Sequence, residues 1–286
     1  HRALTRSELD RDIKRLLRFV ESFDFTRTDE VKALDEQTLD RYLQQLSATG
    51  IVEIITDGNE QVYRIPEGEG RKAAYYRNGL IHFFVDFAIG ELAMLSVTST
   101  GKQAYEDFCE KALYIRDMLK FEFFFEGSAE FLASLLNKMD AHIEGWREAL
   151  NEGPKAVRAT LRHRDLLIGH GSLRPFIEAY LLLSKSLYQL PQNEEVSEKD
   201  LLNKCISLGK QYALQQRVHS EESVSSAYFE NAILLAQSKG LMSPQTSTPE
   251  ARAQFLDDWR VIWRTCRLLA SISDTKKFQE RIELDL

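Results

Sequence analysis

Cysteine is scarce in this chain, and neither sign of charge is in large excess. The 286 residues include three cysteines, 37 basic and 44 acidic side chains, which gives a net charge of −7. An odd number of widely spaced cysteines cannot build a disulfide framework or a C-x-x-C metal knuckle, so they favour a reducing compartment. We predict core packing for Cys109, Cys205 and Cys266. The acidic balance excludes a generally basic nucleic-acid coat, and 43% apolar residues are typical of a globular protein.

No stretch has the about 20 uninterrupted apolar residues that a membrane span needs, and the charged N-terminus does not resemble a signal peptide. The most apolar stretch, residues 80–97, is interrupted by His82, Asp86 and Glu91. We therefore expect a buried core helix there. Peripheral contact with a membrane stays open.

Motifs of several enzyme classes are missing as well. The sequence contains no H-E-x-x-H zinc motif, no G-x-S-x-G nucleophile elbow, no Walker loop and no G-x-G-x-x-G. We predict no metal site and no cofactor. Residues 168–171, Ile-Gly-His-Gly, are interpreted as a flexible turn only.

The first 70 residues predict three helices followed by a β-hairpin. Thr5 and Glu8 form a capping box before one helix, residues 29–34 suggest a short second helix, and Asp35 begins a third that ends at Gly50. Residues 51–56 and 61–65 are rich in β-branched side chains and flank an Asp-Gly-Asn turn. This order is typical of a winged helix, which we assign to residues 1–70.

Charge argues against nucleic acid as the partner of this module. Up to Lys72 there are 12 basic and 15 acidic residues, and the helix that would enter the groove carries Asp35, Glu36 and Asp40 beside Arg41. Such a surface repels phosphates. Winged helices also serve as protein-docking modules, and the fold alone does not decide what this one binds.

Beyond a linker at residues 66–70, the sequence predicts an all-α domain over residues 71–286, so the fold class is mainly α. Residues 75–97 are apolar nearly all round, as expected of one central helix. Further helices are expected over residues 100–120 and from capping residues onward. These caps are Ser128, Ser172, Ser197, Ser220 and Thr248.

The densest polar group precedes that central helix. We expect Tyr76, Arg77, Asn78 and His82 to lie within about one turn of one another. The group forms either a structural hydrogen-bond network, which we favour, or a contact with another domain or ligand.

Two further clusters allow two interpretations each. A phenylalanine run either fills the core, which we favour, or contacts a membrane or another domain; it comprises Phe121, Phe123, Phe124 and Phe125. A basic cluster is either a solvated helix face, again favoured, or a contact for anionic headgroups; its candidates are Arg158, Arg162 and Arg164.

Two loops resemble the phosphate-binding element of glycerolipid acyltransferases: residues 66–68 with Arg71, and residues 125–128. The first has its arginine one place late, and the second lacks both proline and arginine. Those enzymes also use a His-x4-Asp pair, in which the carboxylate orients a histidine base. No aspartate stands five residues after any of the six histidines, so the chain alone is predicted to be inactive.

Four ordered blocks are similar to the C-terminal region of bacterial, membrane-bound glycerol-3-phosphate acyltransferases of the PlsB type. They are Tyr75–Phe84, Leu119–Phe125, Leu173–Tyr180 and Gly209–Ser225, within a resemblance that runs from Ala3 to Leu241. No position matches a catalytic residue of that family, because its acyl-transfer motifs lie upstream.

The resemblance implies a parent that transfers an acyl group from acyl-CoA or acyl-carrier protein to the 1-hydroxyl of glycerol 3-phosphate. The chain begins with His1 rather than Met, so we expect it to be part of a longer protein. Its partner would be its own upstream acyltransferase domain, which it would brace, with peripheral contact at the cytoplasmic face of the bacterial inner membrane. The alternative is a free-standing winged-helix regulatory or scaffold protein.

Overall fold

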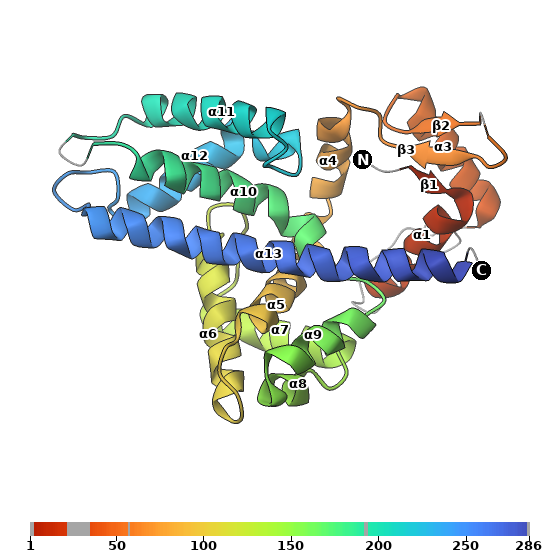
Figure 1. Ribbon diagram of the computed structural model, residues 1–286, viewed down its shortest axis with the longest axis horizontal. Coiled ribbons are helices and arrows are strands. Elements are labelled where there is room, and N and C mark those ends of the chain that lie inside the picture. Colours follow the sequence, from red (N-terminus) through yellow and green to blue (C-terminus); the bar gives the residue numbers. More distant parts are fainter. Residues whose placement is uncertain (1–2, 22–34, 57, 192–193, 285–286) are drawn as a thin grey trace. The chain divides into compact units, whose positions relative to one another are not determined.

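The computed structural model describes residues 3–21, 35–56, 58–191 and 194–284, and these are mainly helical (Figure 1). The chain divides into two compact units, residues 1–80 and residues 81–286. The division that the sequence predicts, after Gly70, stays a prediction. The short helix predicted for residues 29–34 lies outside the described residues.

The first unit combines helices with a small antiparallel sheet of order β1-β3-β2. Its elements are β1 (Leu4–Thr5), α1 (Arg6–Glu21), α3 (Glu36–Ala48), β2 (Glu53–Ile55), β3 (Val62–Arg64) and α4 (Gly70–Asn78). Strands β2 and β3 pair antiparallel, with Ile54 opposite Tyr63. This pairing confirms the predicted hairpin. The sequence did not reveal β1, which places Leu4 on the other side of Tyr63.

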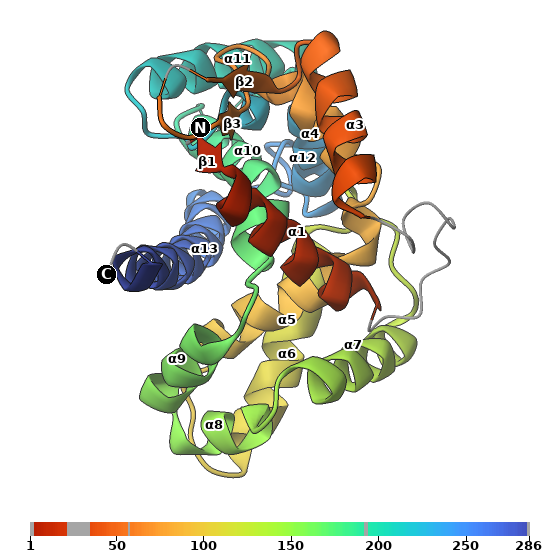
Figure 2. The ribbon, with the colours of Figure 1, turned by 90° about the vertical axis from the view of Figure 1, so that its right-hand side faces the viewer.

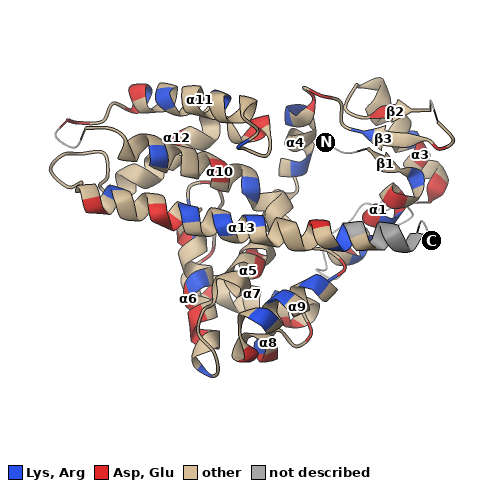
Figure 3. Ribbon diagram, viewed as in Figure 1, with Lys and Arg blue, Asp and Glu red and all other residues tan. Residues whose placement is uncertain are grey.

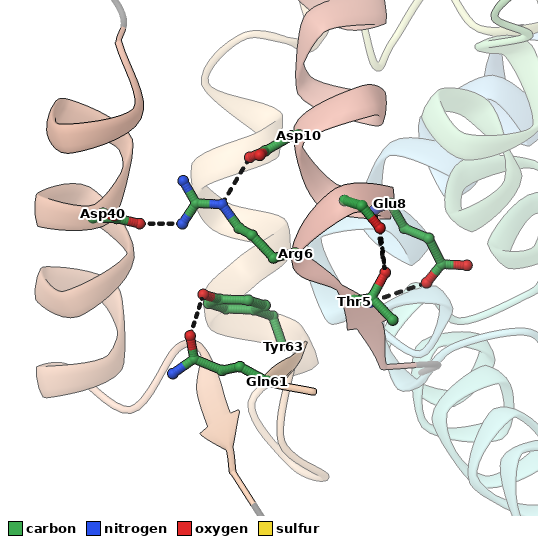
Figure 4. A network of polar contacts seen from close by, with 8 residues as sticks. Thr5, Arg6, Glu8, Asp10, Asp40, Gln61 and Tyr63 are labelled. Carbon is green, nitrogen blue, oxygen red and sulfur yellow. Dashed lines mark hydrogen bonds and ion pairs between the residues drawn. The ribbon is translucent and has the colours of Figure 1, made fainter. Parts of the chain in front are cut away.

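Local side-chain bonds fix the start of α1. The amide of Thr5 donates to Glu8 Oε2 at 2.9 Å, and the amide of Glu8 donates to Thr5 Oγ1 at 3.3 Å, which confirms the capping box (Figure 4). Arg6 then lies between Asp10, at 2.9 Å, and Asp40 of α3. This ion-pair bridge links α1 to α3 across the unit.

All regular elements among the described residues of the second unit are helices. Its elements are η1 (Ile81–Phe83), α5 (Val85–Ser96), α6 (Gln103–Met118), α7 (Ser128–His142), α8 (Trp146–Glu152), α9 (Pro154–His163), α10 (Gly169–Tyr188), α11 (Glu198–Leu214), η2 (Glu221–Ser223), α12 (Ser226–Ser238) and α13 (Pro249–Leu284). Figure 2 shows α7, α8 and α9 at one end of this unit and α11 and α12 at the other.

Helices α5 and α10 lie at the centre of this unit. Every residue from Val85 to Met94 is buried except Asp86, and α5 contacts α6, α7, α9, α10 and α13. Helix α10 packs along α13 and also contacts α5, α11 and α12. At the α10–α13 contact, the rings of Tyr180 and Trp259 are 4.8 Å apart and both are fully buried. The sequence predicted a central helix, apolar nearly all round, over residues 75–97, and α5 is the part of that stretch that lies at the centre.

The single helix expected over residues 75–97 is wrong in its extent. Helix α4 ends at Asn78, η1 follows, and α5 begins at Val85. The break falls at Gly79, and glycine is a poor helix residue because it loses the most backbone freedom on folding. Helix α4 therefore belongs to the first unit, and η1 belongs to the second.

Several predicted caps are confirmed, and others are wrong. Asp35 and Ser197 accept from Thr38 and Asp200, and Thr248 accepts from Ala251. By contrast, α7 has Gly127 as its N-cap instead of Ser128, α10 begins at Gly169 instead of Ser172, and Ser220 caps η2 instead of α12. Core packing is confirmed for Cys205 and Cys266, and Cys109 is half-buried.

One buried cation binds the end of α10. The guanidinium of Arg252 is fully buried and donates to the carbonyls of Leu241, Leu190 and Pro191 at 3.0, 3.3 and 3.2 Å. Carbonyls beyond the last helical turn lack partners within the helix and attract positive charge. Arg252 thereby fixes the start of α13 to the C-terminus of α10.

Candidate functional site

The strongest concentration of buried polar side chains in the described structure surrounds α10, which contains the block Leu173–Tyr180, called the Arg-Pro-Phe block below after its residues 174–176. Two carboxylates with almost no exposure, Glu91 of α5 and Glu178 of α10 itself, organise it. Each accepts hydrogen bonds from a segment far away in the sequence.

Glu178 is 1% exposed and is fully bonded. Its Oε1 accepts from Arg174 Nε at 2.8 Å, and its Oε2 accepts from the amide of His219 at 2.9 Å and the hydroxyl of Ser223 at 2.7 Å. A buried charge is tolerated only when it is paired and hydrogen-bonded in this way. The contact joins the Arg-Pro-Phe block to the block that contains His219, so two blocks of the resemblance form one structural unit.

Glu91 accepts at the N-terminus of α10. Its Oε2 receives the amide of Ile168 at 3.0 Å and that of Gly169 at 2.6 Å. A carboxylate is favoured at this end of a helix, where free amides and the helix dipole are positive. Burial nevertheless raises the pKa of Glu91 to about 7, against the opposing effects of these amides and of Arg164.

Residues 168–171 are therefore not a flexible turn, as the sequence suggested, but the capped beginning of a central helix. The imidazole of His170 is largely buried, and burial lowers its pKa to about 4, so it is neutral near pH 7. Sequence reasoning missed this site because a lone glutamate in an apolar helix gives no sign of its partner.

Gly169 is required by close packing rather than by its backbone angles. A methyl group added there would lie 2.9 Å from Leu269 Cδ2 and 3.0 Å from both the Ala88 carbonyl and Glu91 Oε2. Because the added methyl group would overlap with these atoms, Gly169→Ala should lower the free energy of unfolding by about 1–3 kcal/mol. Urea unfolding followed by circular dichroism measures it.

Gly171, two residues further along α10, is the matched control. No atom lies within 4 Å of the position of its added methyl group, so Gly171→Ala should stabilise the chain by about 0.5–1 kcal/mol. Equal effects of the two substitutions would contradict the assigned close packing.

The polar group predicted at residues 76–82 falls across the boundary between the units. Tyr76, Arg77 and Asn78 stand in the last turn of α4, where Arg77 Nη2 donates to Asn78 Oδ1 at 2.9 Å. His82 lies in η1 of the second unit, with its ring 3.9 Å from that of Phe83. The expected single helical turn is absent, and the functional role of these residues stays a prediction.

The phenylalanine run forms the connection between α6 and α7, and its members differ in environment. Phe123 packs against Phe176 of α10 at 5.0 Å, and Phe125 packs against Phe131 of α7 at 5.6 Å. Phe121 lies 5.2 Å from the ammonium of Lys120. Phe124, in contrast, is 98% exposed. Only Phe124 of this run is therefore fully open to an external partner.

The basic cluster also separates. Arg158 and Arg162 are exposed on α9, whose basic residues are visible in Figure 3. Arg164 is half-buried instead: it donates to the carbonyl of His142, and its guanidinium lies 5.6 Å from the Phe87 ring. Burial lowers the pKa of Arg164, against the attraction of Glu91.

Two kinds of arrangement are absent from the described residues. No group of three or more histidine, cysteine, aspartate or glutamate side chains is arranged to hold a metal ion. No described helix is long and apolar enough to cross a membrane.

Residues 1–245 match the family described as the glycerol-3-phosphate acyltransferase C-terminal region. A putative acyltransferase, plsB1, of Mycobacterium tuberculosis is 30% identical over 277 residues, which cover 95% of this chain and 44% of the relative; the Mycobacterium bovis protein of that name matches equally. A probable mitochondrial glycerol-3-phosphate acyltransferase of Caenorhabditis elegans is 26% identical over 63% of this chain and 28% of its own length. The chain thus spans less than half the length of these relatives.

Proposed function

Because the chain belongs to the family of C-terminal regions of glycerol-3-phosphate acyltransferases, we propose that it is the C-terminal part of such an enzyme. The parent would transfer an acyl group from acyl-CoA or acyl-carrier protein to the 1-hydroxyl of glycerol 3-phosphate. The observation that carries the proposal is the family match over residues 1–245, together with the 44% of the mycobacterial relative that the chain covers.

We also propose that catalysis and structural support belong to different parts of the parent protein. The sequence has no His-x4-Asp pair, so the acyl-transfer chemistry is assigned to the portion upstream of residue 1. This chain would brace that portion. The buried carboxylate of Glu178, which joins α10 to the segment of His219 and Ser223, suits a brace, since satisfied buried hydrogen bonds make a fold rigid.

We also propose that residues 1–70 act as a winged-helix-like module that docks protein. Helices α1 and α3, the β2–β3 hairpin and the added strand β1 support the comparison. The exposed side chains of α3 include Glu36, Asp40 and Arg41, a mixture that suits a protein surface better than a phosphate backbone.

Phe124 is our candidate for the contact with the upstream domain. An exposed aromatic side chain held between two packed neighbours is typical of the anchor residues of interfaces. The proposed role at the cytoplasmic face of the inner membrane rests instead on Arg158 and Arg162, which could meet anionic headgroups.

The test uses the longer parent protein with Phe124→Ser, and Leu214→Ser as control. Leu214 is also an exposed apolar residue, 88% exposed at the end of α11. We expect Phe124→Ser to lower acyltransferase activity about tenfold. The reason is that truncating an interface anchor weakens the contact by at least about 1.4 kcal/mol, which corresponds to a factor of about ten. Membrane sedimentation should not change.

Loss of membrane retention without loss of specific activity would assign Phe124 to the bilayer. If Phe124→Ser behaves like Leu214→Ser in both assays, the contact is excluded. Arg77→Ala and His82→Ala in the same protein test the remaining predicted contacts by the same two readouts.

A further inference from the structure

A cavity of about 230 Å³ lies between α10, α11, α13 and the segment that follows α11. Its polar lining includes Lys185 of α10, Tyr212 of α11, Arg217, and three residues of α13: Arg260, Trp263 and Arg264. All of these belong to the second unit. Tyr212 and Arg217 stand in the block Gly209–Ser225, but the sequence alone did not predict a cavity there.

Positive charge dominates this lining, although the chain as a whole carries −7. Four cationic side chains face one carboxylate, Glu178, which is already bonded to Arg174, His219 and Ser223. Arg260 pairs with Asp257 at 2.7 Å. Among the described residues, no carboxylate lies within ion-pair distance of Lys185, Arg217 or Arg264. Arg217 and Arg264 are exposed to solvent, so an incoming anion can reach them, and three neighbouring cations attract an anion.

Two of these cations are held in position by Tyr212. The Arg217 guanidinium lies 4.2 Å from the Tyr212 ring, and the Lys185 ammonium lies 4.9 Å from it while donating to its hydroxyl. The turn before Arg217 contains Gln216 with φ +53°, the only non-glycine residue with positive φ in the described chain. The amide of Arg217 then donates to the Tyr212 carbonyl at 2.8 Å. Gln216 thus occupies the left-handed position of a common helix C-cap, in which its own amide donates to the Ala213 carbonyl at 2.9 Å, and this cap sets the direction in which the chain leaves α11.

The remaining lining is apolar and includes Leu181, Leu182, Val218 and Leu256 beside Trp263. The site therefore offers a cationic part and an apolar part within one small volume. Drug-sized ligands occupy cavities of about 300–1,000 Å³, so this one suits a headgroup or a small ring. Guanidinium groups bind phosphate oxygens in pairs and are preferred for that anion.

We propose that this cavity binds the phosphate group of a phosphomonoester that also carries an apolar part. Lys185, Arg217 and Arg264 bind the dianion, and Trp263 and the leucines contact the apolar part. The ligand is either a soluble phosphomonoester or the phosphomonoester headgroup of a lipid. The site stands independently of the bracing role proposed above.

Calorimetric titration of the full 286-residue chain with phenyl phosphate tests the site, with inorganic phosphate as the comparison that lacks an apolar part. The lipid arm is co-sedimentation with phosphatidylcholine vesicles that contain phosphatidic acid, against phosphatidylcholine alone. The variants are Arg217→Gln and Arg264→Gln. Lys210→Gln is the control, since Lys210 is exposed on α11, carries the same charge and does not line the cavity.

We expect saturable binding of phenyl phosphate, or of the phosphatidic acid vesicles, that weakens about tenfold in each arginine variant and less than about twofold in Lys210→Gln. Binding of phenyl phosphate in solution identifies a soluble ligand, and binding of the vesicles alone identifies a lipid. Circular dichroism melts confirm that the variants are folded. The proposal is overturned if the wild-type chain binds neither probe, or if the arginine variants bind as Lys210→Gln does.

Discussion

Glu178→Ala is expected to lower the free energy of unfolding by about 3–5 kcal/mol, the range for removing one partner of a buried ion pair. The substitution leaves the Arg174 guanidinium, the Ser223 hydroxyl and the amide of His219 without their shared acceptor. It also separates the segment around η2 from α10. Urea unfolding of the full chain, followed by circular dichroism, measures the change.

Asp257→Ala is the control for this prediction, because it removes a carboxylate from an exposed pair in the same unit. Asp257 accepts from Arg260 at 2.7 Å, and both side chains face solvent. Exposed pairs contribute about 0–1 kcal/mol. If the two variants lose the same stability, the network around Glu178 is not the structural centre that the geometry indicates.

The second prediction concerns pH. Burial raises the pKa of Glu91 to about 7 from 4.5, so between these values the folded chain holds a proton that the unfolded chain releases. The stabilisation that comes from protonated Glu91 is fully present below pH 4.5 and is lost as the pH rises through about 7. The loss amounts to about 3 kcal/mol. Glu91→Gln cannot titrate, so relative to the wild type it should gain about that much between about pH 5 and about pH 8.

Comparison with a variant is necessary because other groups titrate in the same range. Burial raises the pKa of Glu122 to about 7, which adds the same trend, whereas burial lowers the pKa of His170 to about 4 and gives the opposite one. Glu148→Gln, which removes an exposed carboxylate from α8, should leave the wild-type pH dependence unchanged. A Glu91→Gln variant with the same pH dependence as the wild type would show that Glu91 is ionised throughout.

Local signals in the sequence predicted local structure well. The capping box of Thr5 and Glu8 and the caps Asp35 and Ser197 join residues three positions apart, and the hairpin pairs residues 7 to 11 positions apart. Such contacts are encoded by spacing alone. Strand β1 was missed because two residues give no periodicity, and its partner Tyr63 lies on a different segment of the chain.

The functional core could not be predicted in the same way. Glu91 bonds to residues 77 and 78 positions away, and Glu178 bonds to residues 41 and 45 positions away. A single sequence gives no evidence of such pairs, since each glutamate alone looks like an interruption of an apolar helix. The predicted blocks were nevertheless informative, because two of them meet at Glu178. The cavity beside Tyr212 follows a helix C-cap that holds Gln216 in a left-handed conformation, where glycine is the usual residue.

We propose above that this chain is the non-catalytic C-terminal part of a longer acyltransferase. The most direct test is the intact mass of the natural protein, with its upstream peptides sequenced. We expect a protein much heavier than 33.0 kDa, with a His-x4-Asp pair ahead of residue 1. A natural protein of 33.0 kDa would contradict it, because no portion would remain to perform the acyl transfer.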